Sequence, residues 1–418
     1  MKKQFLLSLI ANGSRVVLGF VFFWQVSQAL GLETLGEYIY VIAALGYFGT
    51  LIDYGFNLFV LNTASRSKDT VRPLFLRVVL SKLILTGAAF AILAALYGLA
   101  FSVQGAMVTA LFFAVVILQS FSGLLIQFFK AMGRFEHEFS STMLASLLPL
   151  LLLFMIQSPV TLVALGWLVV AVRLVVLVFQ LAVFFRLTRG QDWRDVEHAA
   201  EQRLPRALAD IRGNFKYAVF SVLGAVFLSV DVVIMRVILG PEDVSIYGTA
   251  MKAIMAVILF FEVLTGVFIP HLARQHQVSP TQFRADVRRF TVIMLAGASA
   301  VSLSLMALGP TAVTLAFGAE FAQAGHVLQV LSLVLIFRVM TMVSGSLLTV
   351  YGLQSFRARV MTIVLPIHLI MNLVLQPKFG IWGAVGTLAT SFLLLFILNS
   401  LYLIRKKGAG QAPAHGAG

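Results

Sequence analysis

Eight ionisable side chains lie within long apolar stretches of this sequence. The five basic ones are Arg15, Lys82, Arg173, Lys252 and Arg338, and the three acidic ones are Asp53, Asp231 and Glu262. A charge at bilayer depth is costly, so such residues usually face a partner or a water-filled cavity. Guanidinium groups bind phosphate oxygens through paired hydrogen bonds. The basic surplus therefore predicts a cationic cavity, lined by the five basic residues, that takes an anionic ligand. The alternative for Lys82 and Arg338 is that their side chains extend toward the cytoplasm.

The three acidic residues predict a second kind of chemistry. An intramembrane carboxylate can change its partner or its protonation, so we predict gating or ion-coupling roles for Asp53, Glu262 and Asp231. The alternative for each is a structural ion pair that holds helices together. At a rise of about 1.5 Å per residue, Arg15 and Asp53 lie at similar depths, as do Asp231 and Lys252. Both pairs are placed to form ion pairs, whereas Glu262 has no obvious partner.

The elements that carry these charges are predicted to be membrane-spanning helices. Hydrophobic residues make up 60% of the 418 residues and charged residues 11%, with a mean hydropathy of +0.96. A soluble domain carries about a quarter charged residues, and a helix needs about 20 apolar residues to cross the bilayer. The segments that qualify are 5–30, 37–63, 74–98, 104–129, 139–157, 160–186, 213–238, 245–270, 286–309, 322–350, 357–375 and 381–404. The first segment has no convincing cleavage site, which favours a retained span over a signal peptide.

The distribution of Lys and Arg predicts the orientation of these twelve spans. One set of alternate loops holds 24 of the 31 basic residues, and the opposite set holds only Lys378. Because cytoplasmic loops are enriched in Lys and Arg, both termini are predicted to be cytoplasmic. The predicted divisions are an N-lobe with spans 1–6 (1–186), a cytoplasmic amphipathic linker (187–212), a C-lobe with spans 7–12 (213–404) and a disordered cytoplasmic tail (405–418).

Two short stretches indicate an internal repeat. "LGLETLGEY" (30–38) and "LGPEDVSIY" (239–247) share the pattern L-G-x-E-x4-Y at an offset of 209 residues. Four matches over nine positions are also compatible with chance. The same offset carries Asp53 to Glu262. Six spans separate the two stretches, so both halves enter the membrane from the same side, and transport sites tend to lie between such parallel repeats.

Several classes of function lack support in the sequence. There is no cysteine, no G-x4-G-K-[ST] phosphate loop and no metal-ligand spacing among the histidines, so we predict no cofactor and no metal. The net charge of +14 does not favour nucleic acid, because the basic residues lie in short loops between apolar segments. A membrane glycosyltransferase, polymerase or ligase would need a substantial outer loop for its catalytic residues. The predicted outer loops are short, so we predict that the protein is not an enzyme.

Four stretches, in order, resemble a known family. The first, "QALGLETLGEYIYVIAALGYFGTLIDYGFNLFVLNTASR" (28–66), contains an L-G-x4-G-x-Y turn, the triplet DYG at 53–55 and a Ser-Arg pair at its end. The others are "DVVIMRVILGPEDVSIY" (231–247), "FGAEFAQAGHVLQVLS" (317–332) and "FGIWGAVGTLATS" (379–391). In these features the chain resembles the Wzx-type polysaccharide-export flippases of the multidrug/oligosaccharidyl-lipid/polysaccharide exporter superfamily.

The resemblance implies a fold and a function. The fold is an all-α polytopic membrane protein with twelve transmembrane helices in two pseudo-symmetric six-helix lobes, V-shaped as in MATE transporters. The function is to move a polyprenyl-pyrophosphate-linked oligosaccharide, such as an O-antigen, capsule or exopolysaccharide repeat unit, from the cytoplasmic to the periplasmic leaflet of a bacterial inner membrane by alternating access. Related lipid-linked-sugar flippases have cationic central cavities, which makes the five basic residues candidates for a lining.

The same resemblance sets expectations for partners and keeps one alternative open. The expected partners are the anionic lipid-linked oligosaccharide, a coupling ion (H+ or Na+) and the polysaccharide polymerase machinery, with no nucleic acid. The alternative is a multidrug or organic-cation antiporter of the same superfamily. That function predicts a cavity with a net acidic lining, which is opposite to the charge count here.

Overall fold

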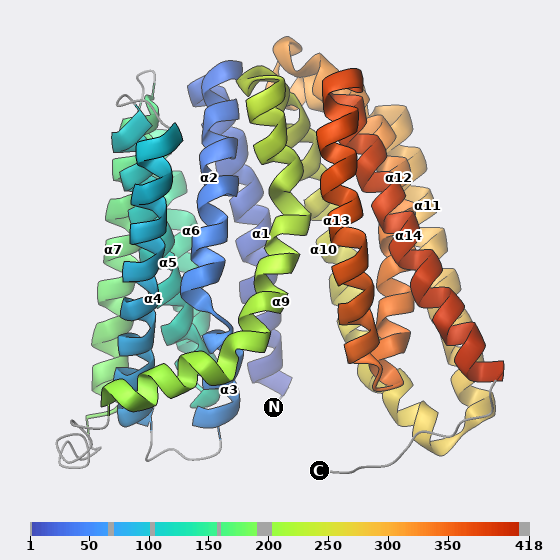
Figure 1. Cartoon of the computed structure of the whole chain (residues 1–418), viewed down its shortest axis with the longest axis horizontal. Helices are drawn as coiled ribbons and strands as arrows, with labels where there is room; N and C mark the ends of the chain where they lie inside the picture. The colour runs from blue at the N-terminus through green and yellow to red at the C-terminus, as the bar shows by residue number, and fades with distance from the viewer. Residues whose placement is uncertain (1, 66–70, 101–104, 157–159, 190–202, 409–418) are drawn as a thin grey trace. The chain divides into compact units, whose positions relative to one another are not determined.

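The computed structural model describes residues 2–65, 71–100, 105–156, 160–189 and 203–408, and all regular elements in these ranges are helices (Figure 1). The chain divides into two compact units, the first made of Met1–Thr34 and Tyr40–Ser229 and the second of Leu35–Ile39 and Val230–Gly418. Helix α2 and helix α9 each contribute residues to both units.

Within the described residues, the first unit is built on seven helices and the first part of an eighth. They are α1 (Lys2–Leu30), α2 (Leu32–Asp53), α3 (Phe56–Ala64), α4 (Val71–Ala100), α5 (Ala106–Ala131), α6 (Phe135–Met155), α7 (Leu162–Leu187) and α9 (Arg203–Ile238). The main helix pairs are α1 with α6 and α5 with α7.

The described part of the second unit contains Leu35–Ile39 of α2, the end of α9 and five further helices with one short 3-10 turn. They are α10 (Pro241–Val278), α11 (Pro280–Phe317), η2 (Ala319–Phe321), α12 (Ala322–Val350), α13 (Gln354–Phe379) and α14 (Ile381–Gly408). Helix α12 packs against α10, α11 and α14, and more than half of its most apolar stretch is buried, so it is the central helix of this unit.

Eleven segments of the described chain are long and apolar enough to cross a membrane. In chain order they correspond to the predicted spans 2 to 12, and α1 covers the predicted first span. The prediction of an all-α polytopic membrane protein is confirmed. The second span differs from its prediction, because it is not one continuous helix: α2 ends at Asp53 and α3 begins at Phe56.

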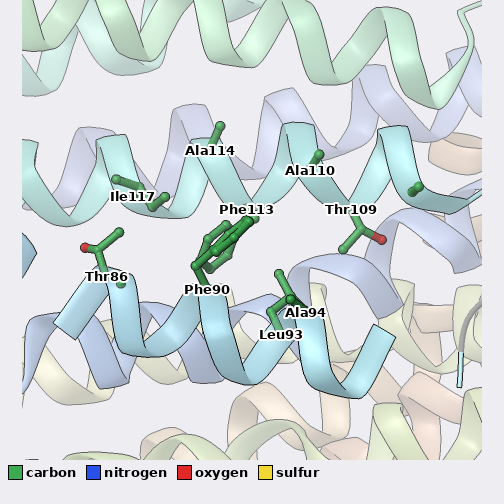
Figure 2. A pocket seen from close by; sticks show the side chains of 11 residues that line it. Thr86, Phe90, Leu93, Ala94, Thr109, Ala110, Phe113, Ala114 and Ile117 are labelled. Atoms are coloured by element: carbon green, nitrogen blue, oxygen red, sulfur yellow. The ribbon is translucent and has the colours of Figure 1, made fainter. Parts of the chain in front are cut away.

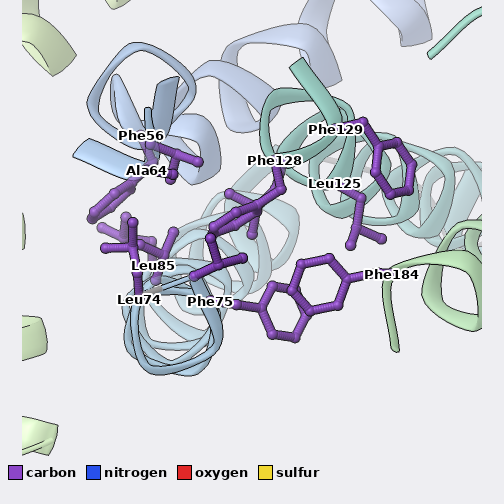
Figure 3. Packing of buried hydrophobic residues seen from close by; sticks show 13 residues of the cluster. Phe56, Ala64, Leu74, Phe75, Leu85, Leu125, Phe128, Phe129 and Phe184 are labelled. Carbon is purple, nitrogen blue, oxygen red and sulfur yellow. The ribbon is translucent and has the colours of Figure 1, made fainter. Parts of the chain in front are cut away.

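Aromatic side chains hold one end of the first unit together (Figure 3). Phe75 on α4 lies with its ring centroid 4.5 Å from that of Phe184 on α7 and 5.7 Å from that of Phe128 on α5. Phe56 on α3 joins the same buried cluster, and Ile211 on α9 packs against it. Because lipid tails are as apolar as these side chains, close packing rather than escape from water stabilises such a core.

The first turns of α9 pack against α4 within the first unit. Ser81 Oγ donates a hydrogen bond to the carbonyl oxygen of Ala207 (3.3 Å), and Arg77 Nε lies 2.6 Å from Asp210 Oδ2. Helix α9 then continues without a break to Ile238, through the boundary predicted at residue 212 between the linker and the seventh span. Residues 190–202 of the predicted linker and 409–418 of the predicted tail lie outside the described residues, and α14 extends to Gly408 within the stretch predicted as a tail.

Candidate functional site

Both copies of the repeated sequence form the same kind of turn. Gly31 precedes α2 with φ 72°, and Gly240 precedes α10 with φ 121°. Residues with a side chain rarely adopt such positive φ values, so glycine is needed at each turn. The tyrosines that end the two motifs, Tyr38 and Tyr247, are both buried. The shared pattern therefore has a structural basis at the start of the second helix of each half.

Asp53 lies at a helix break inside the second span. Tyr54 follows it with φ 45° and is the only residue other than glycine with a positive φ in the described chain, and Gly55 has φ 78°. A Cβ at position 55 would lie 2.7 Å from Cβ of Tyr217 on α9, so the break packs directly against that helix. The DYG triplet thus ends α2, turns the chain and places a carboxylate at the turn.

The carboxylate of Asp53 is bound by two residues from other helices. Asp53 Oδ1 accepts hydrogen bonds from Lys82 Nζ on α4 (2.8 Å) and from Ser120 Oγ on α5 (2.6 Å). Lys82 is fully buried and also donates to the carbonyl oxygen of Ser120 (2.9 Å), whereas the Asp53 side chain is 35% exposed. The predicted pairing of Asp53 with Arg15 is therefore wrong. Depth along a helix does not say which way a side chain points, and Asp53 points toward α4 and α5.

Arg15 and Arg173 line one cavity within the first unit. The cavity has a volume of about 130 Å³ and lies among α1, α6 and α7, with Gly19, Ser146 and Pro149 in its lining. At about 30 Å³ per water it has room for roughly four water molecules. No acidic side chain lines it, and Arg15 forms no ion pair within the described residues. Two guanidinium groups that share a small cavity without a carboxylate are suited to an anion such as a phosphate group.

In the second unit Glu262 has a partner that depth counting did not identify. Arg338 Nη2 on α12 lies 3.7 Å from Glu262 Oε1 on α10, and the guanidinium also lies over the ring of Phe392 at 5.1 Å. Asp53 and Glu262 correspond by the repeat, yet their ion-pair partners, Lys82 on α4 and Arg338 on α12, come from helices that do not correspond. Lys252 lies on α10, and its side chain is exposed.

Asp231 is held in a buried polar network rather than an ion pair. Tyr247 Oη and the backbone N–H of Val232 donate to its carboxylate. Gln376 Nε2 on α13 donates to the carbonyl oxygen of Asp231 (3.1 Å) and to Asn372 Oδ1 (2.7 Å). The predicted ion pair of Asp231 with Lys252 is not formed, because these groups surround the carboxylate instead.

The surplus of unpaired basic side chains within the spans is smaller than the sequence predicts. Lys82 and Arg338 are each within ion-pair distance of an acidic residue, and no acidic side chain is among the residues that line the cavity of Arg15 and Arg173. Two further ion pairs within the described residues are not predicted by the sequence. Glu37 accepts from Arg236 Nε (3.0 Å), and the buried Glu138 accepts from Lys130 Nζ (2.9 Å) and Ser8 Oγ (3.2 Å). Neither pair has a regular sequence spacing that would have revealed it.

Asp210, the partner of Arg77, lies outside the membrane-spanning segments. Burial raises the pKa of Asp210 above its usual value, and the neighbouring Arg77 guanidinium acts in the opposite direction. Among the residues that the structure describes, no group of three or more His, Cys, Asp or Glu side chains is placed to hold a metal ion. The arginine cavity and the intramembrane carboxylates are candidate ligand-binding sites.

Solved structures support the fold. Over 95% of this chain and 96% of the other, the structure is similar to a MATE family multidrug resistance transporter of the MOP superfamily in an inward-facing conformation, with a TM-score of 0.71 and 14% identity. It is also similar to the lipid II flippase MurJ in an inward closed conformation, with a TM-score of 0.69 and 12% identity over 96% of this chain and 87% of that one. At these identities the similarity shows a common fold.

Relatives with curated names come from the biosynthesis of cell-surface glycans. The chain is 28% identical to the probable low-salt glycan biosynthesis flippase Agl15 of Haloferax volcanii over 45% of this chain and 40% of that protein. It is 25% identical to the capsular polysaccharide biosynthesis protein CapF of Staphylococcus aureus over 45% of this chain and 47% of that one. These two matches span less than half of each relative.

A third relative matches along the whole chain. The putative O-antigen transporter of Shigella dysenteriae is 19% identical over 96% of this chain and 100% of its own length. The model of the family described as "polysaccharide biosynthesis protein" matches residues 1–276, which is well over half of the sequence. This chain is therefore a member of the polysaccharide biosynthesis protein family.

Proposed function

We propose that this protein is a flippase that moves a polyprenyl-pyrophosphate-linked oligosaccharide from the cytoplasmic to the periplasmic leaflet of a bacterial inner membrane. The family and the names of the relatives support a role with lipid-linked glycans. The observation that carries the proposal is that Arg15 and Arg173 line one cavity and that no acidic residue is in its lining. An organic cation would be repelled by these guanidinium groups, so the cavity favours an anionic cargo over a multidrug substrate.

In this proposal the arginine cavity receives the phosphate end of the cargo. A guanidinium is charged at all physiological pH values and offers parallel N–H donors, so it can replace the water that the pyrophosphate loses on leaving the headgroup region. Arg15 and Arg173 come from different helices, α1 and α7. A phosphate bound between them would therefore draw these two helices together. Lys252, which is exposed on α10, does not line this cavity and is proposed as a separate contact for the anionic cargo.

The intramembrane carboxylates are proposed to gate the transport cycle or to couple it to an ion. Asp53 lies at a break in its span, where the backbone can change direction without disrupting a continuous helix. The Asp53 carboxylate would leave Lys82 for another partner, and return to it, as the helix break opens and closes. Glu262, paired with Arg338, and Asp231, held by Tyr247, have the corresponding roles in the second half. H+ or Na+ is the proposed coupling ion.

The cellular setting follows from the same proposal. Both termini are placed in the cytoplasm, the two lobes are proposed as 1–186 and 213–404, and the sequence between them is an amphipathic linker on the cytoplasmic face. The polysaccharide polymerase machinery is the proposed partner, because the lobes deliver repeat units to the leaflet where chains are extended. The protein itself is proposed to carry out transport and no bond-making step.

A leaflet-exchange assay tests this function. The full chain is reconstituted into vesicles with a fluorescent polyprenyl-pyrophosphate oligosaccharide, and an impermeant quencher reports the fraction of label in the outer leaflet. We expect faster exchange with the protein than without it, and no inhibition by an organic cation dye. Exchange of the dye, with no exchange of the lipid-linked sugar, would overturn the proposal in favour of the antiporter.

Charge reversal connects the assay to the cavity. We expect Arg15→Glu and Arg173→Glu to abolish exchange while leaving membrane insertion intact, because a carboxylate in the cavity repels the phosphate. Arg288→Glu is the matched control, since Arg288 is an exposed arginine on α11 that lines none of the cavities described here. Unchanged exchange in both cavity variants would remove these arginines from the mechanism.

A further inference from the structure

An apolar groove runs between α4 and α5 within the first unit (Figure 2). Its volume is about 670 Å³, and its lining contains no charged side chain. Phe90 on α4 and Phe113 on α5 meet across it with their ring centroids 6.4 Å apart. A Cβ built at Gly87 would meet no other atom within 4 Å, so the space beside α4 is empty of protein at that point. The groove is open along one side, where Gly87 and Phe90 are exposed.

The groove occupies one half of the membrane-spanning region. On α4 it extends from Thr86 to Ala94, beyond the midpoint of the candidate span Val71–Leu96, and on α5 it extends from Ala106 to Ile117, before the midpoint of Ala106–Ala131. At about 1.5 Å per residue these stretches are roughly 12–17 Å long. Half of a hydrocarbon core about 30 Å thick is about 15 Å. The groove thus matches the depth of one leaflet, on the side where α4 ends and α5 begins.

Both the shape and the chemistry of the lining indicate a hydrocarbon chain. The long axis of the groove runs along the two helices, in the direction in which lipid chains lie. Small residues make it wide: Gly87 and Ala94 on α4, and Ala106, Ala110 and Ala114 on α5. A methyl-branched polyprenyl chain is thicker than an unbranched acyl chain and carries double bonds that can pack against aromatic faces. The width and the Phe90–Phe113 pair therefore favour the branched chain.

We propose that the α4–α5 groove binds the polyprenyl chain of the lipid-linked cargo in the leaflet to which α4 runs. This inference rests on the proposed function, and the proposed topology makes that leaflet the outer one. The polar end of the groove supports the placement: Thr86 lies one helical turn from Lys82, which binds Asp53. A chain seated in the groove would end beside the helix break that is proposed to move. The groove would hold the tail while the sugar is released.

Photo-crosslinking of the full chain in lipid nanodiscs tests the proposal. One probe is a polyprenyl phosphate with a diazirine in its chain, and the comparison probe is phosphatidylglycerol with a diazirine in an acyl chain. We expect the polyprenyl probe to label 86–94 or 106–117 and to be displaced by unlabelled polyprenyl phosphate. Equal labelling of these stretches by the phospholipid probe would overturn the assignment.

A groove-filling variant makes the test specific. Gly87→Leu adds a side chain whose Cβ would meet no other atom within 4 Å, and it raises helix propensity, so we expect folding to be preserved. We expect it to reduce polyprenyl labelling about tenfold, the change for displacing about two methylene groups of bound chain. Ala88→Leu is the matched control, because Ala88 is exposed on α4 and does not line the groove. Unchanged labelling in Gly87→Leu would refute the groove.

The outcomes separate the groove from the proposed function. If the wild-type protein labels no better with the polyprenyl probe than with the phospholipid probe at any peptide, then both the groove and the proposed function fail. If the polyprenyl probe labels specifically but only outside 86–94 and 106–117, then the groove assignment fails and the flippase proposal stands.

Discussion

The Asp53–Lys82 ion pair is asymmetric, and this asymmetry leads to a quantitative prediction. Lys82 is fully buried, whereas the Asp53 side chain is 35% exposed and also accepts a hydrogen bond from Ser120. Asp53→Asn would leave a buried ammonium with only the Ser120 carbonyl oxygen and a neutral amide. Removing one partner of a buried ion pair costs about 3–5 kcal/mol. We expect the free energy of unfolding to fall by that amount.

Lys82→Met is expected to be milder. The carboxylate that it leaves behind still accepts from Ser120 Oγ and reaches solvent, so the loss should be about 1–3 kcal/mol, as for a hydrogen-bonded group that loses one partner. The double variant Asp53→Asn with Lys82→Met has no uncompensated charge. It should be more stable than Asp53→Asn alone, with a coupling energy of about 1–3 kcal/mol.

The assay is reversible unfolding of the purified protein in mixed micelles, followed by a helical signal over a titration with denaturing detergent. Glu136→Gln provides the comparison, because the Arg134–Glu136 pair is 3.6 Å apart with both side chains at least half exposed. Such exposed pairs contribute about 0–1 kcal/mol. Equal losses for the two single variants, or strict additivity in the double variant, would refute the view that burial of Lys82 governs this pair.

Three other predictions concern the structure around the site. Gly55→Ala should cost about 1–3 kcal/mol, because position 55 has a positive φ and its Cβ would meet Tyr217, whereas Gly13→Ala, where no atom lies within 4 Å, should be neutral or stabilising in the same titration. Glu37→Gln should destabilise by up to about 1 kcal/mol, since Glu37 and Arg236 are each about one-third exposed, and a loss equal to that of Asp53→Asn would contradict this. The folded-state pKa of Asp210 is raised above the usual 3.8, so this carboxyl binds more protons in the folded protein than in the unfolded chain. The contribution of Asp210 to stability therefore falls as pH rises through and above about 3.8. Arg77→Met removes the group that lowers this pKa, so the decline of melting temperature with pH should become steeper, and a shallower decline would show that burial does not control Asp210.

Much of the fold could be predicted from composition and pattern. Twelve apolar segments were enough to identify an all-helical membrane protein, since in hydrocarbon a chain must satisfy its backbone hydrogen bonds within each helix. The repeated glycines Gly31 and Gly240 marked equivalent turns because a positive φ restricts residue choice locally. The presence of Asp53 inside a span also indicated a special position, and the structure places a helix break there.

The partners of the intramembrane charges could not be predicted in this way. The sequence supplied the depth of each charged residue, but a partner depends also on the direction of the side chain around its helix and on which helices are neighbours. Asp53 therefore binds Lys82 instead of Arg15, and Asp231 binds Tyr247 instead of Lys252. The α4–α5 groove likewise depends on how two helices diverge beside small residues that are unremarkable in the sequence. Local backbone constraints are written along the chain, whereas pairing between helices is a property of their three-dimensional packing.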